Sequence, residues 1–231
     1  MATTGCPSHY GWAMVEVRLY AIGIDEVRDW FGSGPAGAAS LRGVAAQRFR
    51  VPAAEQRSSG LLAKLGPLFR RDPWAPHIPV DLPTPADVEM LINARFVPPE
   101  RLDAAWTVVR AWLDELSWGH VVTVLGDTEW RDLEFDLARA GVPSQFAISK
   151  LWNLDPSLPL RPVPGTEVGY ARHHHAVATR DALDGAWQRV ADPSREPLHD
   201  ILGFLRGLDA WTAMASAAGR PAPDVVGVCR A

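Results

Sequence analysis

Cysteine and lysine are nearly absent from this sequence, and their absence limits the classes of protein to which it can belong. The cysteines are Cys6 and Cys229, at opposite ends of the 231-residue chain. They provide neither a disulfide framework nor the ligand spacing of a zinc site. Lysine occurs only at Lys64 and Lys150, whereas arginine is frequent. We interpret this imbalance as the coding bias of a GC-rich genome and not as evidence of nucleic-acid binding.

Long apolar runs are also missing. No stretch approaches the roughly 18–20 apolar residues that a membrane-spanning helix requires, and residues 1–12 lack the apolar core of a signal peptide. We therefore expect a cytoplasmic protein without membrane contact.

The motifs of the common enzyme classes are absent as well. There is no Gly-x-Ser-x-Gly nucleophile, and the glycines of residues 32–37 lack both the lysine of a phosphate-binding loop and the spacing of a dinucleotide fingerprint. We expect no cofactor. With 47% hydrophobic and 22% charged residues, the composition is that of a globular domain. We assign this domain to residues 15–231, after a flexible leader at 1–14.

Hydrophobic periodicity predicts an α/β fold of the α+β type. Residues 15–22 alternate with a period of two, which predicts a half-buried strand, and residues 225–229 form a second β-branched segment. We predict that these two strands pair, because both are short and bounded by turn residues. The expected architecture is a small mixed sheet that includes the N- and C-terminal strands and is covered by several helices. The remaining expected elements are strands at 120–125 and 166–173 and helices at 24–31, 35–49, 61–69, 84–93, 98–118, 128–140, 178–190 and 198–218.

Tryptophan and arginine suggest a surface that binds another protein. Both residue types are enriched at the centres of protein interfaces, and Trp74 and Trp152 lie in segments predicted to be loops. A possible basic lobe at 35–71, followed by a proline-rich connector at 72–85, contributes Arg48, Arg50 and Arg57. We expect this lobe to meet the acidic helix at residues 129–136 or a partner protein. Nucleic-acid binding through the same lobe is an alternative, although no aromatic residues are interleaved with the arginines as single-strand binding generally requires.

A small metal-dependent hydrolase is the other alternative. On a strand, His173 and His175 would share one face, and two imidazoles with a carboxylate make a common metal site. Asp132 and Asp136 are the candidate carboxylates, on the helix where Glu129 shares their face. This hypothesis requires the histidines and the carboxylates to converge in one pocket. No known metal-binding motif accompanies them, so we expect no tightly bound metal.

Three parts of the sequence carry a family resemblance: residues 19–28 with Gly32 and Gly34, residues 140–151 with 159–162 and 168–170, and the C-terminal helix ending at Gly219 with residues 224–228 after it. Together they resemble the YfbM-like proteins of unknown function, especially their actinobacterial relatives. The proline-rich connector and the basic lobe depart from that family's pattern. The resemblance implies a compact α/β domain and an accessory or immunity-type protein that acts by binding another protein. Since none of these motifs is catalytic, no functional residue can be carried over.

Overall fold

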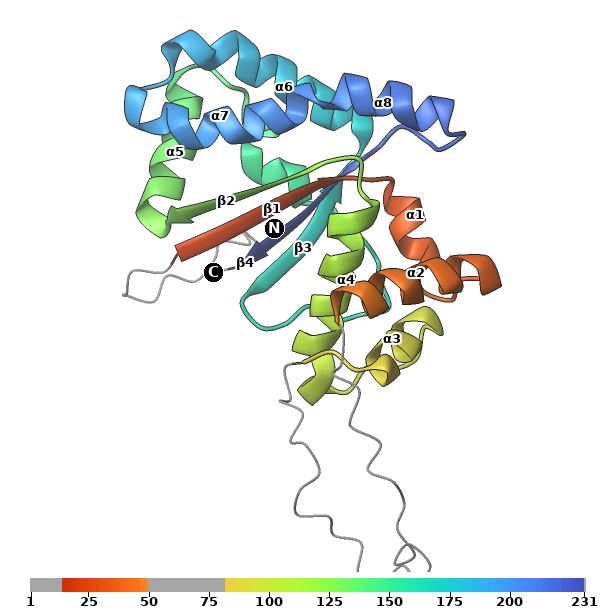
Figure 1. Cartoon of the computed structure of the whole chain (residues 1–231). Coiled ribbons are helices and arrows are strands. Elements are labelled where there is room, and N and C mark those ends of the chain that lie inside the picture. The colour runs from red at the N-terminus through yellow and green to blue at the C-terminus, as the bar shows by residue number, and fades with distance from the viewer. Residues whose placement is uncertain (1–13, 50–81, 231) are drawn as a thin grey trace, which may run out of the picture.

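The computed structural model describes residues 14–49 and 82–230. They contain one four-stranded sheet in the order β2-β1-β4-β3 (Figure 1), built from β1 (Met14–Ala21), β2 (His120–Gly126), β3 (Thr166–Ala171) and β4 (Val225–Arg230). The predicted pairing of the terminal strands is confirmed, with Val17 opposite Cys229 and Ala21 opposite Val225. The expectation of a mixed sheet is wrong, because all three strand pairs are antiparallel.

The strands are antiparallel because each connecting segment returns the chain to the same end of the sheet that it left. The chain leaves the sheet after Ala21 and re-enters beside it, where the Ala21 amide donates to the carbonyl of Gly119 at 2.9 Å. In the same way, β4 begins at Val225, directly opposite Ala171 at the end of β3. Each new strand therefore starts at the end of the sheet where the previous strand stopped, and runs in the opposite direction.

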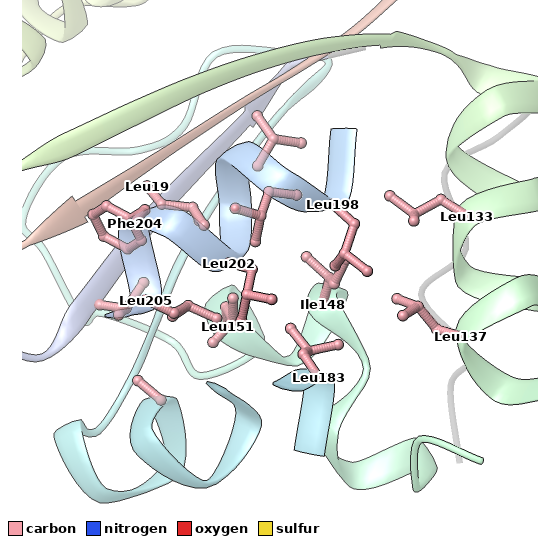
Figure 2. Close-up of a cluster of buried hydrophobic side chains, with 14 of the residues drawn as sticks. Leu19, Leu133, Leu137, Ile148, Leu151, Leu183, Leu198, Leu202, Phe204 and Leu205 are labelled. Carbon is pink, nitrogen blue, oxygen red and sulfur yellow. The ribbon is translucent and has the colours of Figure 1, made fainter. Parts of the chain in front are cut away.

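Helices cover both faces of the sheet (Figure 1). One face packs against α5 (Asp127–Arg139), α6 (His173–Ala186), α7 (Asp192–Arg206) and α8 (Leu208–Ala217). In Figure 2, Leu133 and Leu137 of α5 lie across this layer from Leu198 of α7. The other face packs against α1 (Ile24–Asp29), α2 (Pro35–Arg48), α3 (Pro85–Ile92) and α4 (Leu102–Leu116).

Strand β1 is more buried than the half-buried strand that was expected: Glu16 and Arg18 on its second face are partly buried, and both faces are fully buried from Leu19 to Ala21. Its alternation is as predicted, since Val17 and Leu19 face the α5–α8 layer and Tyr20 faces the α1–α4 layer. The central position of β1 in the sheet explains the difference, because helices pack on each side of it. The Tyr20 hydroxyl is satisfied by donating to Asp114 of α4 at 3.1 Å.

Most predicted helices are present within a few residues of their expected bounds. The apolar stripe of α4 is buried as predicted, from Leu102 to Leu113, and Trp112 donates from its indole to the carbonyl of Leu41 in α2 at 3.0 Å. The single helix expected at 198–218 is instead two helices, α7 and α8, which meet at Gly207. A Cβ atom on Gly207 would lie 2.6 Å from the Trp211 ring, so this ring requires a glycine where the helices meet. Short 3-10 turns complete the elements at η3 (Pro99–Arg101), η4 (Ser144–Phe146), η5 (Ile148–Trp152) and η6 (Trp187–Arg189).

The predicted leader, basic lobe and connector fall largely outside the described residues, as does the helix expected at 61–69. The described part of the lobe is α2, and the described end of the connector places Thr84 as the N-cap of α3, where its hydroxyl accepts from the Asp87 amide. Within 14–49 and 82–230, no helix has the length and apolarity needed to cross a bilayer.

Candidate functional site

Trp152 is buried, so its predicted role as an exposed binding residue is wrong. Only 8% of its surface is accessible, and its ring lies 5.8 Å from that of Trp130. The sheet accommodates it through Gly169 and Gly227, which pair across β3 and β4. A Cβ atom at Gly169 would come within 1.7 Å of the Trp152 carbonyl oxygen. Two facing glycines thus make a depression in the sheet that the tryptophan segment fills.

The predicted arginine surface is only partly described. Trp74, Arg50 and Arg57 lie outside the described residues, whereas Arg48 is exposed in the last turn of α2. The neighbouring Arg42 pairs with Glu89 of α3 at 2.6 Å. In the described part of the lobe, the acidic partner of this arginine is therefore α3 and not the helix at 129–136.

His173 and His175 lie in the first turn of α6, so the prediction that they share one face of a strand is wrong. The helix begins there because the Asp224 carboxylate accepts from the His173 amide at 2.8 Å, as an N-terminal cap does. The Nδ1 atom of His173 lies 2.9 Å from the carbonyl oxygen of Pro223. His175 packs against the Phe146 ring at 5.7 Å, and this burial lowers the pKa of its imidazole.

Asp132 and Asp136 do not converge with these histidines. Asp136 accepts a hydrogen bond from the Ser194 hydroxyl of α7 at 2.7 Å, which ties α5 to α7. Over the ranges 14–49 and 82–230, no three side chains of His, Cys, Asp or Glu form a group that could hold a metal ion. The described residues therefore provide no metal centre for the hydrolase hypothesis.

The two edges of the sheet differ in whether another segment forms backbone hydrogen bonds with them. Along β3, the segment after η5 covers the edge: Leu154 and Tyr170 exchange backbone hydrogen bonds of 3.2 and 3.1 Å. Along β2, no backbone hydrogen bond joins residues 120–125 to any described residue other than those of β1. The outer edge of β2 is therefore open among the described residues, and an open edge is a template for a further strand.

The register identifies which groups of β2 face outward. Ala21 bonds toward the β2 side, whereas the next residue, Ile22, bonds toward Asp224 on the β4 side. Since the direction alternates along a strand, Leu19 and Val17 bond to their β2 partners Val121 and Thr123. The amides and carbonyls of Val122 and Val124 consequently point away from the sheet. Their side chains are also exposed, at 39% and 49%.

A groove of about 420 Å³ runs along this edge. We call it the β2–α7 groove, because its walls are β2 on one side and the starts of α5 and α7 on the other, two helices that lie close to β2 in Figure 1. Four consecutive β2 residues, 122–125, line it. Because neighbouring side chains of a strand point to opposite faces, this places the groove along the edge. The helical walls are acidic and contribute Glu129, Asp132, Glu196 and Asp200.

The groove leaves polar groups without partners. Among the described residues, Asp132, Glu196 and Asp200 make no ion pair. Thr123 lines the groove with only 7% of its surface accessible, and its Oγ1 atom has no hydrogen-bond partner in the part of the chain that the structure describes. Sequence reasoning found the strand and the acidic face of α5, but missed Thr123, Glu196 and Asp200. The sequence did contain one indication of this site. Glu196 and Asp200 lie four residues apart, and two acids at this spacing on a helix repel each other unless a cation lies nearby.

A comparison with models of protein families, with curated proteins and with solved structures finds no match to this chain.

Proposed function

We propose that the protein is a cytoplasmic protein-binding module whose partner adds a strand to the outer edge of β2. The observation that carries this proposal is the edge at Val122 and Val124, where backbone groups that have no partner among the described residues coincide with exposed apolar side chains. Backbone hydrogen bonds along a free edge give affinity, and pockets for alternate side chains give specificity. Such a module acts by binding to another protein, as an accessory or immunity protein does.

The contrast between the two edges supports β2 as a site rather than an ordinary sheet border. Proteins usually protect an edge with charged residues, proline or a covering segment. The β3 edge is covered by residues around Leu154, but the outward positions Val122 and Val124 of β2, which follow His120, carry neither a charge nor a proline.

The test is a comparison of proteins captured from the native cell by the wild-type chain and by Val124→Pro. Proline at this position removes an outward amide and leaves the β1 ladder intact, an arrangement that edge strands tolerate. We expect a partner that the wild type and the exposed control Met214→Ala capture equally and that Val124→Pro loses. Equal capture by all three variants would contradict binding at β2.

A further inference from the structure

We propose that the partner segment is basic: an extended stretch in which arginine or lysine alternates with apolar residues, the cationic side chains lying in the β2–α7 groove. The inference rests on the proposed function, since it identifies the chemistry of the strand that would add to β2.

The alternation follows from the two faces of the sheet at this edge. A strand paired to β2 sends successive side chains to opposite faces. On the face of α5 and α7 they would enter the β2–α7 groove. On the other face they would lie beside the exposed side chains of Val122 and Val124. One set of side chains thus meets carboxylates and the other meets apolar surface.

Among the described residues, no cation pairs with the acids of the groove, although the Glu129 carboxylate accepts from the Gly126 amide at 2.8 Å. Glu129 and Asp132 are three residues apart on α5, and Glu196 and Asp200 are four apart on α7, so each helix presents two acids on one face. No arginine or lysine is among the residues that line the groove. Elsewhere, arginine pairs with carboxylates throughout the described chain, as in Arg220 with Glu26 at 2.6 Å. A cation supplied by the partner would relieve the repulsion within each pair of acids.

Thr123 is an independent indication that a hydrogen-bond donor binds here. Thr123 lines the groove and is more than nine-tenths buried, and its Oγ1 atom, itself buried, has no hydrogen-bond partner among the described residues. Buried hydroxyls are normally satisfied, and one left unpaired is costly. A guanidinium or ammonium group that enters the groove brings several donors and no acceptor, which suits the carboxylates and, once the Thr123 side chain turns its oxygen toward the groove, the hydroxyl as well.

The arrangement suits an organic cation better than a metal ion. Across the described residues no three acidic or imidazole side chains are grouped closely enough to coordinate a metal. The carboxylates come from two helices, α5 and α7, that line a groove of about 420 Å³. The planar fork of arginine suits such a lining, because it binds carboxylates through several separated N–H groups.

Peptide selection on the full-length chain tests the inference. Short random peptides are displayed and selected on the wild type, after depletion on Val124→Pro so that only β2-dependent sequences are kept. We expect enrichment of arginine and lysine at alternate positions with apolar residues between them. The affinity of a selected peptide should fall about tenfold for Asp132→Asn/Asp200→Asn, since two exposed ion pairs are lost. It should be unchanged for the charge-matched control Asp29→Asn/Glu115→Gln.

The outcomes separate this inference from the proposed function. Peptides that depend on β2 but show no basic enrichment would leave strand addition standing and overturn the basic partner. Failure to select any β2-dependent peptide would overturn both. Dimerisation of the chain that Val124→Pro abolishes would make a second copy the occupant and overturn the inference. So would calcium or manganese that binds the wild type, competes with the peptide, and is lost in Asp132→Asn/Asp200→Asn.

Discussion

Gly227 lies beneath the side chain of Trp152, and a Cβ atom added to this glycine would come within 2.6 Å of the tryptophan Cβ. Gly169, its neighbour across the β3–β4 ladder, is approached by the Trp152 backbone. The two glycines therefore determine how closely η5 packs on the sheet, and with it the segment that covers the β3 edge.

We expect Gly227→Ala to lower the free energy of unfolding by about 2–3 kcal/mol, because overpacking a rigid contact displaces its neighbours. Urea unfolding measures this directly. Gly185→Ala is the control: Gly185 lies in α6 with no atom near its added Cβ, so alanine should stabilise that helix by about 0.5–1 kcal/mol. Equal effects of the two substitutions would show that Trp152 does not pack as described.

Asp224 should be among the carboxylates most important for stability. It accepts from the amides of Ile24 at 3.1 Å and His173 at 2.8 Å, the first residues of α1 and α6, and from the Arg172 guanidinium. We expect Asp224→Ala to cost about 2–4 kcal/mol, since several donors lose their acceptor. Asp103→Ala, at an exposed position of α4, should change the urea midpoint little, with less than about 0.5 kcal/mol. A similarly small effect at Asp224 would contradict its capping role.

Thr123→Val should separate stability from binding. Removing an unsatisfied hydroxyl at constant shape is expected to raise the free energy of unfolding by about 1 kcal/mol, while the affinity for a selected basic peptide decreases. Thr84→Val, which removes the N-cap of α3, should instead cost about 1 kcal/mol. Thermal unfolding and peptide titration of both variants provide the measurements. A destabilised Thr123→Val protein would mean that the hydroxyl already has a partner in the fold.

The buried carboxyl of Glu134 should make the folding stability of the protein depend on pH. Burial raises the pKa of its carboxyl above the ordinary value of 4.5, against the opposing effect of the hydrogen bond from the Ser149 amide. The folded state then holds the proton more tightly than the unfolded state, so this group's contribution to stability is present at low pH and is lost as pH rises through the raised pKa.

Glu134→Gln keeps an acceptor for Ser149 and removes the titration. Its advantage over the wild type in urea unfolding should grow between about pH 4 and pH 7. The exposed control Glu115→Gln should show no such trend. A constant difference between Glu134→Gln and the wild type across this range would rule out the raised pKa as a source of pH dependence.

The fold was largely predictable because local patterns coincide with the final burial. The alternation of β1, the stripe of α4 and the pairing of β1 with β4 all follow from periodicity and turn residues. The direction of β2 and β3 depends on where long helical segments return, which no local pattern contains. The start of α6 at His173 likewise depends on Asp224, a cap 51 residues away in the chain.

The candidate site was less predictable than the fold. Trp152 sits in a turn by sequence, and its burial depends on two glycines in other strands. The valines of β2 look like those of a buried strand, because only the strand order shows that this strand lies at an edge. Asp132 was recognised as one of several acids on α5, but Glu196 and Asp200, which line the same groove, belong to α7.

Amide hydrogen exchange of the full-length chain, resolved by residue, tests the open edge of β2 most directly. The register predicts alternation: slow exchange at Val121, Thr123 and Leu125, which bond to β1, and fast exchange at Val122 and Val124. A peptide bound along the edge should slow exchange at Val122 and Val124 alone. Protection of Val122 and Val124 in the free protein, equal to that of Thr123, would mean that the edge is already occupied and would contradict the account.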